Sequence, residues 1–424
     1  MKLLFEASRE LPLVQLVATF RVGGVHDPVG LEGLSRVTAR MLRRGSRSMT
    51  GEQLEARIEA VGAELAAHVG LGATTVGIET LSRSLDKALP IAAELIAEPR
   101  FDEAELDKLK RQIEAEIVTS RDEDDGLASR ALRRKLFAGH PHGRRVQGTV
   151  ASIRAITRED VIAHHRRAFS RENAIVAVGG DVNEDQAATL AAQLLERLPS
   201  GEALAYSVPQ PTPPKGRRLV MVDKPDRSQC QLGIGTLGAD LADEDYVPLL
   251  LANAVFGGMF TSRLNQEVRV KRGWSYGASS GLATGPVREA FTIWAAPSVE
   301  DAIACLELEV GLLEAFCDAG IDEAEVRFAG EYMRRSYAFE IDTGKKRLQQ
   351  KLDCALLNLS EDFHAKTIER ISSVTAEEAS RAVARRLDSK ALWVTAVVDA
   401  EDIGKELAAA LPWDEVVVEP IDLD

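Results

Sequence analysis

Several features that assign proteins to a class are scarce in this chain of 424 residues. Cysteine occurs only four times, at positions 230, 305, 317 and 354, and never in C-x-x-C spacing. We therefore expect buried, reduced thiols in place of a disulfide framework or a cysteine metal site. The longest apolar stretch, Leu11 to Phe20, contains Gln15 and is too short for a membrane span.

The sequence also has neither a signal-peptide pattern at its start nor a Walker A nucleotide-binding motif. The first ten residues, MKLLFEASRE, contain no signal-peptide apolar region, so we expect a cytoplasmic protein, or a periplasmic one if a leader was removed. No Walker A motif occurs, and GGDV at Gly179 to Val182 lacks the G-x-G-x-x-G pattern of a dinucleotide site. The net charge of −14, from 66 acidic and 52 basic residues, argues against nucleic acid as a main partner.

What the chain does contain is the composition of an ordinary globular protein, divided by a proline-rich segment. Hydrophobic residues make up 45% and charged residues 28% of the chain. Val208 to Gly216 (VPQPTPPKG) has four prolines in nine residues, which neither a helix interior nor a central strand tolerates. We expect an N-terminal domain at 1–207, a linker at 208–217 and a C-terminal domain at 218–424.

The two halves of the chain repeat one another. FDEAELDKLKRQIEAEI, from Phe101, is similar to IDEAEVRFAGEYMRRSY, from Ile321, at an offset of 220. The segments that start at Ala155 and Ser373 match at an offset of 218. This pattern predicts an α+β fold of two homologous domains from an internal duplication, each a mixed or antiparallel sheet with helices packed on one face.

Local signals place several helices. Thr157 and Thr375 each precede an acidic residue by three positions, in the pattern of a capping box. A third box starts at Thr50 and opens a helix expected over residues 51–65. His164 and His165 lie beside two arginines, and we interpret them as part of a solvated helix face.

The segment from Gly30 to Ser46, GLEGLSRVTARMLRRGS, predicts an amphipathic helix closed by a glycine. Three apolar side chains share the face that we expect to be buried: Leu34, Val37 and Met41. Arg36 and Arg40 lie one turn apart on another face. From periodicity alone, this second face is a solvated basic surface near a helix C-terminus.

Together with the preceding GGVHDPV, this segment resembles the ligand helix of the pitrilysin family of zinc metallopeptidases, which carries H-x-x-E-H. Arg36 and Arg40 stand at the two histidine positions, and Ala39 stands at the position of the general-base glutamate. The third ligand of the family, a glutamate further along the chain, corresponds to Glu116. Guanidinium has no lone pair for a metal, so the resemblance implies a member without zinc of its own. We predict that Glu116, or Glu114 beside it, forms an ion pair with Arg36 or Arg40.

A second segment, FGGMFTSRLNQEVRVKRGWSYGASSG from Phe256, resembles the family in its C-terminal half, where an arginine and a tyrosine lie seven residues apart. Arg269 and Tyr276 have this spacing. We expect a helix over 262–272, stopped by Gly273, and a strand over 274–280. The resemblance implies that Arg269 and Tyr276 hold the substrate carbonyl, as paired hydrogen-bond donors. The alternative from spacing alone is a core tyrosine and a surface arginine.

A third segment, from Lys135 to Ile153, contains His140 and His142. They are two residues apart, but no third ligand lies near them in sequence, so we interpret them as part of a structural turn. The family carries a similar His-Pro stretch before a Gly-Thr helix start.

The resemblance extends from about Val14 to about Asp399 and implies a role. In heterodimeric bacterial members and in mitochondrial processing peptidase, two subunits divide the work, and one lacks zinc. We therefore expect a non-catalytic subunit that completes a peptide-binding chamber and supplies Arg269 and Tyr276 beside the zinc of a homologous partner. Alone it would have no peptidase activity and no cofactor. The alternative is an inactive homodimeric pseudopeptidase that acts as a peptide-binding or scaffold protein.

Overall fold

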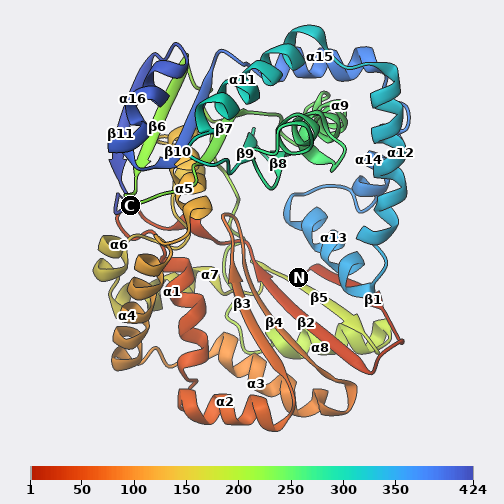
Figure 1. Cartoon of the computed structure of the whole chain (residues 1–424). Coiled ribbons are helices and arrows are strands. Elements are labelled where there is room, and N and C mark those ends of the chain that lie inside the picture. The colour runs from red at the N-terminus through yellow and green to blue at the C-terminus, as the bar shows by residue number, and fades with distance from the viewer. Residues whose placement is uncertain (1, 424) are drawn as a thin grey trace. The chain divides into compact units, whose positions relative to one another are not determined.

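The computed structural model describes residues 2–423, which form two compact units with one sheet each (Figure 1). The N-terminal unit comprises residues 2–117, 144–208 and 338–363. The C-terminal unit comprises residues 118–143, 209–337 and 364–423. Each unit therefore includes a segment from the other half of the chain.

The sheet of the N-terminal unit has five strands in the order β1-β5-β2-β4-β3. Its strands are β1 (Lys2–Ala7), β2 (Leu13–Phe20), β3 (Glu64–Val69), β4 (Thr74–Leu81) and β5 (Ala174–Gly180). Strands β1 and β5 are parallel, and every other neighbouring pair is antiparallel. The helices of this unit are α1 (Leu34–Met41), α2 (Gly51–Ala60), α3 (Leu85–Ala97), α4 (Glu103–Thr119), α6 (Val150–Ala155), α7 (Arg158–Ala168), α8 (Glu184–Leu195) and α13 (Gly344–Leu356).

The sheet of the C-terminal unit has six strands in the order β11-β6-β10-β7-β9-β8. Its strands are β6 (Arg217–Asp223), β7 (Gln231–Leu237), β8 (Ala278–Leu282), β9 (Ala290–Ala295), β10 (Leu392–Val398) and β11 (Glu415–Pro420). Its helices are α5 (Asp124–Leu136), α9 (Tyr246–Asn253), α10 (Arg263–Asn265), α11 (Ala302–Ala319), α12 (Glu323–Glu340), α14 (Phe363–Ile371), α15 (Ala376–Arg386) and α16 (Ala400–Ala410).

The pairing pattern confirms the duplication. Strands β6 and β10 are parallel, like β1 and β5, and the chain of antiparallel neighbours β10-β7-β9-β8 repeats β5-β2-β4-β3. Strand β11 is an addition to the second sheet, parallel to β6. The predicted α+β fold with two homologous sheets is therefore correct.

Two equivalent helices are exchanged between the halves of the chain. Helix α5 packs its apolar residues, including Leu132, against Val220 and Val397 of the second sheet. Helix α13 packs Leu348 and Leu352 against the first sheet. Each exchanged helix thus belongs to the core of the unit built mainly from the other half, and covers apolar sheet residues that would otherwise contact water.

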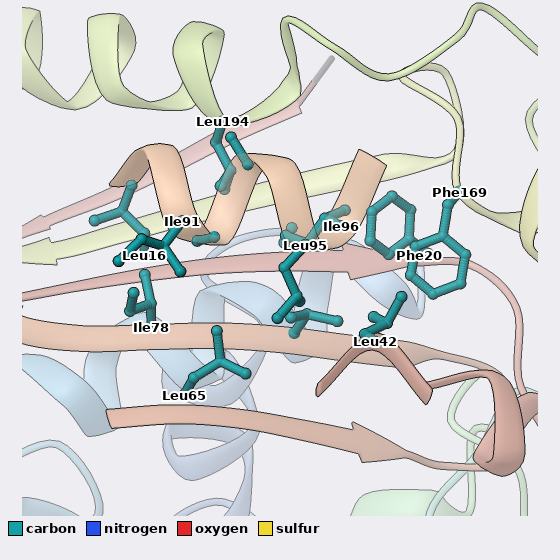
Figure 2. Packing of buried hydrophobic residues seen from close by; sticks show 14 of the residues in the cluster. Leu16, Phe20, Leu42, Leu65, Ile78, Ile91, Leu95, Ile96, Phe169 and Leu194 are labelled. Atoms are coloured by element: carbon teal, nitrogen blue, oxygen red, sulfur yellow. The ribbon is translucent and has the colours of Figure 1, made fainter. Parts of the chain in front are cut away.

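The main core of the N-terminal unit lies between its sheet and helices α3 and α8 (Figure 2). Leu16 and Ile78 come from neighbouring strands, and Leu95 of α3 is fully buried in the same cluster. The rings of Phe20 and Phe169 lie 4.4 Å apart at the end of this layer. Burial of this kind stabilises the unit by about 1.5–3 kcal/mol for each large apolar side chain, and it fixes the sheet that carries the site.

The capping predictions are confirmed, but one helix is shorter than expected. Thr50, Thr157 and Thr375 each accept a hydrogen bond from a backbone N–H three residues later, in reciprocal capping boxes. The helix from Gly51 ends at Ala60, and the segment 64–69 is strand β3. Gly62, with a φ of +62°, makes the reversal between them, a conformation that favours glycine.

The interpretation of His164 and His165 as solvated residues is wrong. Both side chains are buried, and His165 Nε2 lies 2.8 Å from the carbonyl oxygen of Ile96. The His165 ring also stacks on Phe169. Burial lowers the pKa of His165 to about 4, so it is neutral near pH 7. The helix turns its two histidines inward and its arginines outward, an arrangement that the sequence alone did not reveal.

Two further observations concern a possible membrane span and the state of the cysteines. One helical stretch, Tyr246–Lys271, is long and apolar enough to cross a membrane by length and composition. Since 61% of its most apolar window is buried, and a core helix meets the same criterion, this is weak evidence for a span. All four cysteines are free thiols, three of them buried and Cys317 half-buried.

Candidate functional site

Helix α1 is fixed at its start by a buried carboxylate. Asp27 accepts hydrogen bonds from the backbone N–H groups of Gly33 and Ser35 at 2.9 Å each, and from Ser35 Oγ at 2.6 Å. A carboxylate is favourable at a helix N-terminus, where free N–H groups and the helix dipole meet it. Burial raises the pKa of Asp27 to about 6 against the opposing effect of these hydrogen bonds. Ser35 Oγ also lies 3.2 Å from His164 Nε2 of α7, so α1 is held from two sides.

The core-facing side of α1 is as predicted, since Leu34, Val37 and Met41 are buried. The helix continues as a 3-10 turn over 42–44 and stops at Gly45, whose φ is +127°. This packing fixes the direction of the opposite face, which carries Arg36 and Arg40.

Arg36 and Arg40 converge on one carboxylate, as predicted for Glu116. Arg40 donates from Nη1 to Glu116 Oε2 at 2.6 Å and from Nη2 to Oε1 at 2.8 Å. Arg36 Nη2 donates to Oε2 at 3.0 Å, and Gln112 donates to Oε1 at 3.1 Å. The hydrogen bond from Arg40 is the first cause that holds the pKa of Glu116 below its usual range. The neighbouring Glu114 pairs with Arg154 instead.

The residues at these positions do not fit zinc. Two guanidinium groups offer no lone pair, and Glu116 already accepts four hydrogen bonds. Ala39 is buried and presents a methyl group, which cannot accept a proton from water. Within residues 2–423, no group of three His, Cys, Asp or Glu side chains is arranged to hold a metal ion. Water activation by a metal therefore has no support from the donor set of α1 and α4.

This cluster opens into a cavity of about 1290 Å³ in the N-terminal unit. The cavity is bounded by α1, the start of α2, the end of β3 and helix α4. Strand β3 is the outer strand of its sheet. The position of the lost metal site is therefore still a large, open and highly charged cavity.

The second predicted site starts with an irregular helical segment. The stretch before and after Ser262 is π-helical, over 254–258 and again over Gln266–Lys271, with the short α10 between. Ser262 caps α10, Leu264 and Val268 are buried as expected, and Gly273 ends the segment with a φ of +69°. π-Helical insertions widen the turn and re-aim side chains, and they are frequent at functional sites.

The strand expected over 274–280 begins later than predicted. Strand β8 covers Ala278–Leu282, so Tyr276 lies in the loop before it, with 93% of its surface exposed. The alternative of a core tyrosine is therefore wrong. An exposed phenol on a loop is accessible to a ligand or partner.

Arg269 lies beside two aromatic rings. Its guanidinium carbon is 5.3 Å from the centroid of Tyr276 and 4.7 Å from that of Phe260. Cation–π contacts of this length orient the guanidinium without neutralising it. Lys271 and Arg272 share Glu267, whereas Arg269 forms no ion pair within residues 2–423.

A cavity of about 460 Å³ adjoins this arginine, lined also by Phe260, Trp294 and the first residues of β8. Phe260 was not predicted, because no spacing rule connects it with Arg269. The structure thus brings Arg269 and Tyr276 together, as the sequence predicted, and adds an exposed aromatic ring to the pair.

His140 and His142 form a turn, as interpreted. His142 is buried with its Nδ1 2.5 Å from Glu289 Oε1, and its backbone N–H donates to His140 Nδ1 at 3.1 Å. His140 Nε2 lies 2.8 Å from the carbonyl oxygen of Pro209. Their polar atoms join the 3-10 turn at 141–143 to the start of β9 and to the proline-rich segment.

Comparison with known proteins gives the family. The family model described as Insulinase (Peptidase family M16) matches residues 4–150, and the one described as Peptidase M16 inactive domain matches residues 155–330. A Helicobacter pylori protein named a non-peptidase homolog is 23% identical over 375 residues, which are 88% of this chain and 86% of that protein. A Mycobacterium tuberculosis protein named an uncharacterized zinc protease is 27% identical over 377 residues, or 87% of this chain and 84% of that protein.

Solved structures agree with this assignment. A peptidase M16 inactive domain from Pseudomonas fluorescens has a TM-score of 0.86 at 27% identity, with 93% of this chain and 94% of that one covered. A chain of complex III from Candida albicans has the same fold, with a TM-score of 0.75 at 13% identity and coverage of 96% and 97%. The chain belongs to peptidase family M16.

Proposed function

We propose that this protein is a catalytically inactive family member that binds peptides as the zinc-lacking subunit of a metallopeptidase. In this role Arg269 and Tyr276 donate hydrogen bonds to the substrate carbonyl. One observation carries the proposal: Arg269 has no carboxylate partner within residues 2–423, and it lies against an exposed phenol at the edge of a cavity.

The chemistry follows from the donors. Attack on a peptide carbonyl places negative charge on its oxygen, and a guanidinium and a phenol aimed at that oxygen stabilise the charge. The contact with Phe260 restricts the Arg269 side chain before substrate arrives, which lowers the entropy lost on binding. A zinc ion held by a homologous partner subunit would activate the attacking water.

The N-terminal unit supports the proposal that this chain is catalytically inactive. Its Arg36 and Arg40 pair with Glu116, and none of the three side chains is free to hold a metal ion. A relative named a non-peptidase homolog shows that the family includes members without that activity. We therefore infer that the zinc belongs to a second, homologous chain, and that both act in the same compartment, which we take to be the cytoplasm.

The test is co-expression with a zinc-bearing homologue from the same genome. Cleavage of a fluorogenic peptide is measured for the pair and for each chain alone. The proposal predicts activity only in the pair, and loss of that activity on Arg269→Ala or Tyr276→Phe.

Lys271→Ala is the matched control, because Lys271 is a cation on the same helical segment and pairs with Glu267. It should leave the activity of the pair unchanged. A partner that is fully active alone, or that does not bind this chain, would overturn the proposal. Stable self-association of this chain would then favour the homodimeric pseudopeptidase.

A further inference from the structure

The proposed function does not explain why the cavity beside Arg36 and Arg40 is lined by so many charged side chains. Six cationic side chains line it, from arginines 36, 40, 43, 44 and 100 and from Lys108. Five carboxylates line it as well, from Glu52, Glu55, Asp102, Glu105 and Glu116. Most of these charges are paired locally, and the pairs show which clusters keep a positive charge.

The pairs on the cavity wall account for most of the cations. Arg43 pairs with Glu55 at 2.6 Å, and Lys108 pairs with Glu105 at 2.6 Å. Arg100 lies 3.9 Å from Asp102. Arg44 lies 3.9 Å from Glu105, the partner of Lys108. Arg36 and Arg40 both lie within 3.0 Å of the single carboxylate of Glu116, so this cluster of three residues keeps one positive charge.

That net charge equals the charge of a site with one Zn²⁺, two neutral imidazoles and one carboxylate. The cluster has therefore lost the metal chemistry but kept an electropositive centre. Burial, and next the charge of Arg40, lower the pKa of the Arg36 guanidinium, as expected where two cations lie close together.

The two guanidinium groups carry more N–H donors than they use in hydrogen bonds to Glu116. Each guanidinium carries five N–H groups, and together they make three hydrogen bonds to Glu116. Arg36 Nη1 is buried and makes no hydrogen bond within residues 2–423, so a ligand would meet the exposed part of the two guanidinium groups. Their side chains keep 22% and 24% of their surface exposed, on the wall of the cavity.

We propose that this cavity binds the carboxylate group of a peptide at Arg36 and Arg40 and holds the peptide without cleaving it. Planar guanidinium groups suit bidentate binding of carboxylates. Ala67, His68 and Val69 of the outer strand β3 line the same cavity and present backbone groups to an extended ligand. The inference rests on the proposed function only in taking the ligand to be a peptide.

The carboxylate has two possible sources, the peptide C-terminus and an acidic side chain. Fluorescence anisotropy with this chain alone would compare one labelled peptide in four forms: with a free or amidated C-terminus, and with an internal Glu or Gln. The site predicts at least about tenfold tighter binding for one carboxylate over its neutral form, the gain expected of a hydrogen-bonded charge. The form that gains identifies the source.

Two variants should act in opposite directions. Arg36→Gln leaves the Arg40–Glu116 pair and should weaken carboxylate binding, whereas Glu116→Gln removes the competing anion and should tighten it. Damage to the fold would weaken binding in both. Arg154→Gln removes an exposed cation outside the cavity and is the control, with no effect expected.

Equal affinity for all four peptides would overturn the inference. So would a Glu116→Gln variant that weakens binding or leaves it unchanged, even if Arg36→Gln fails to fold. Because the assay needs no zinc-bearing partner, its outcome is independent of the activity test. Arg269→Ala should lose the activity of the pair and keep the carboxylate preference.

Discussion

In the N-terminal unit, Arg36 and Arg40 lie in a cavity beside the outer strand β3 and bind Glu116. In the C-terminal unit, Arg269 lies in a cavity beside the outer strand β8, and its guanidinium lies against the rings of Phe260 and Tyr276. The two strands are equivalent in the duplicated sheets. The same edge of one fold thus carries two arginines that share one carboxylate in one unit and, in the other, an arginine without an ion pair within residues 2–423.

The two arrangements differ in how much of the arginine charge is left for a ligand. An arginine paired with a carboxylate has most of its favourable charge interaction inside the protein, whereas one that stacks on rings keeps its charge for a ligand. Glu116 therefore limits the positive charge of Arg36 and Arg40 but does not cancel it.

The largest expected effect comes from rebuilding the zinc motif. Arg36→His, Ala39→Glu and Arg40→His together restore H-x-x-E-H on α1, and Glu116 is within reach of residues 36 and 40 in the present structure. Three protein ligands suffice for a catalytic zinc. We expect about one zinc per chain after dialysis, measured by metal analysis.

The same triple variant with Glu116→Gln is the control for this experiment and should retain much less zinc. If the triple variant retains no more zinc than the natural chain, α1 and α4 do not preserve the ligand geometry of the family.

The second effect separates the two arginine sites by activity. In the pair with a zinc-bearing homologue, Arg269→Ala should lower kcat by about 10²–10³-fold, the cost of one donor to an oxyanion. Arg36→Ala should leave kcat within a fewfold, since Arg36 is bound to Glu116. Equal losses of kcat for the two variants in steady-state kinetics would show that the two arginines do not differ in their contribution to activity.

A third prediction concerns Glu309, which is fully buried, whereas Glu116 is partly exposed and paired with arginines. Glu309 on α11 is fully buried, neither of its carboxylate oxygens has a hydrogen bond within residues 2–423, and burial raises its pKa to about 8. In the unfolded chain the group ionises near pH 4.5. Between these values the unfolded state loses the proton and the folded state keeps it, so Glu309 costs more stability as the pH rises.

Glu309→Met should therefore raise the free energy of unfolding by about 2–3 kcal/mol near pH 8 and by less near pH 5. Denaturant unfolding at both pH values measures this. Glu307→Met, on an exposed position of the same helix, should change stability by less than about 0.5 kcal/mol. A gain that does not depend on pH would mean that Glu309 is not protonated in the fold.

A smaller effect compares the two arginines by stability. Arg40→Ala should destabilise the chain by about 1–2 kcal/mol, because it leaves Glu116 with Arg36 alone on a partly exposed surface. Arg269→Ala should change the free energy of unfolding by less than about 0.5 kcal/mol, since it removes only contacts with exposed rings. Thermal unfolding of both variants tests the order.

The smallest effect is the pH dependence of the Glu116 cluster. Since hydrogen bonds from Arg40 and the charges of both arginines lower the pKa of Glu116, its contribution is present above the unfolded value near pH 4.5 and is lost as the pH falls through the folded value. The stability difference between the natural chain and Glu116→Gln should be constant from pH 6 to 8 and shrink below about pH 4.5. A difference that persists at pH 3 would contradict this.

The sequence by itself determined the family resemblance, the duplication and three capping boxes, and it predicted an ion pair of Glu116 or Glu114 with Arg36 or Arg40. These features depend on local spacing: a capping box needs residues three apart, and a helix face needs residues four apart. The partner across the fold followed from the motif, because Glu116 holds the place of a ligand to the same centre. For Arg269 and Tyr276, a shared site followed from the family resemblance and not from the spacing alone, and their use by a substrate stays a prediction.

Only the tertiary structure decided the features that depend on distant contacts. The exchange of α5 and α13, the burial of His164 and His165, and the contact of Phe260 with Arg269 have no local signal. Strand β8 also starts later than its residues suggest, which leaves Tyr276 exposed on a loop. The physical reason is that packing against another element sets burial and strand ends, and it overrides the weak preferences of single residues.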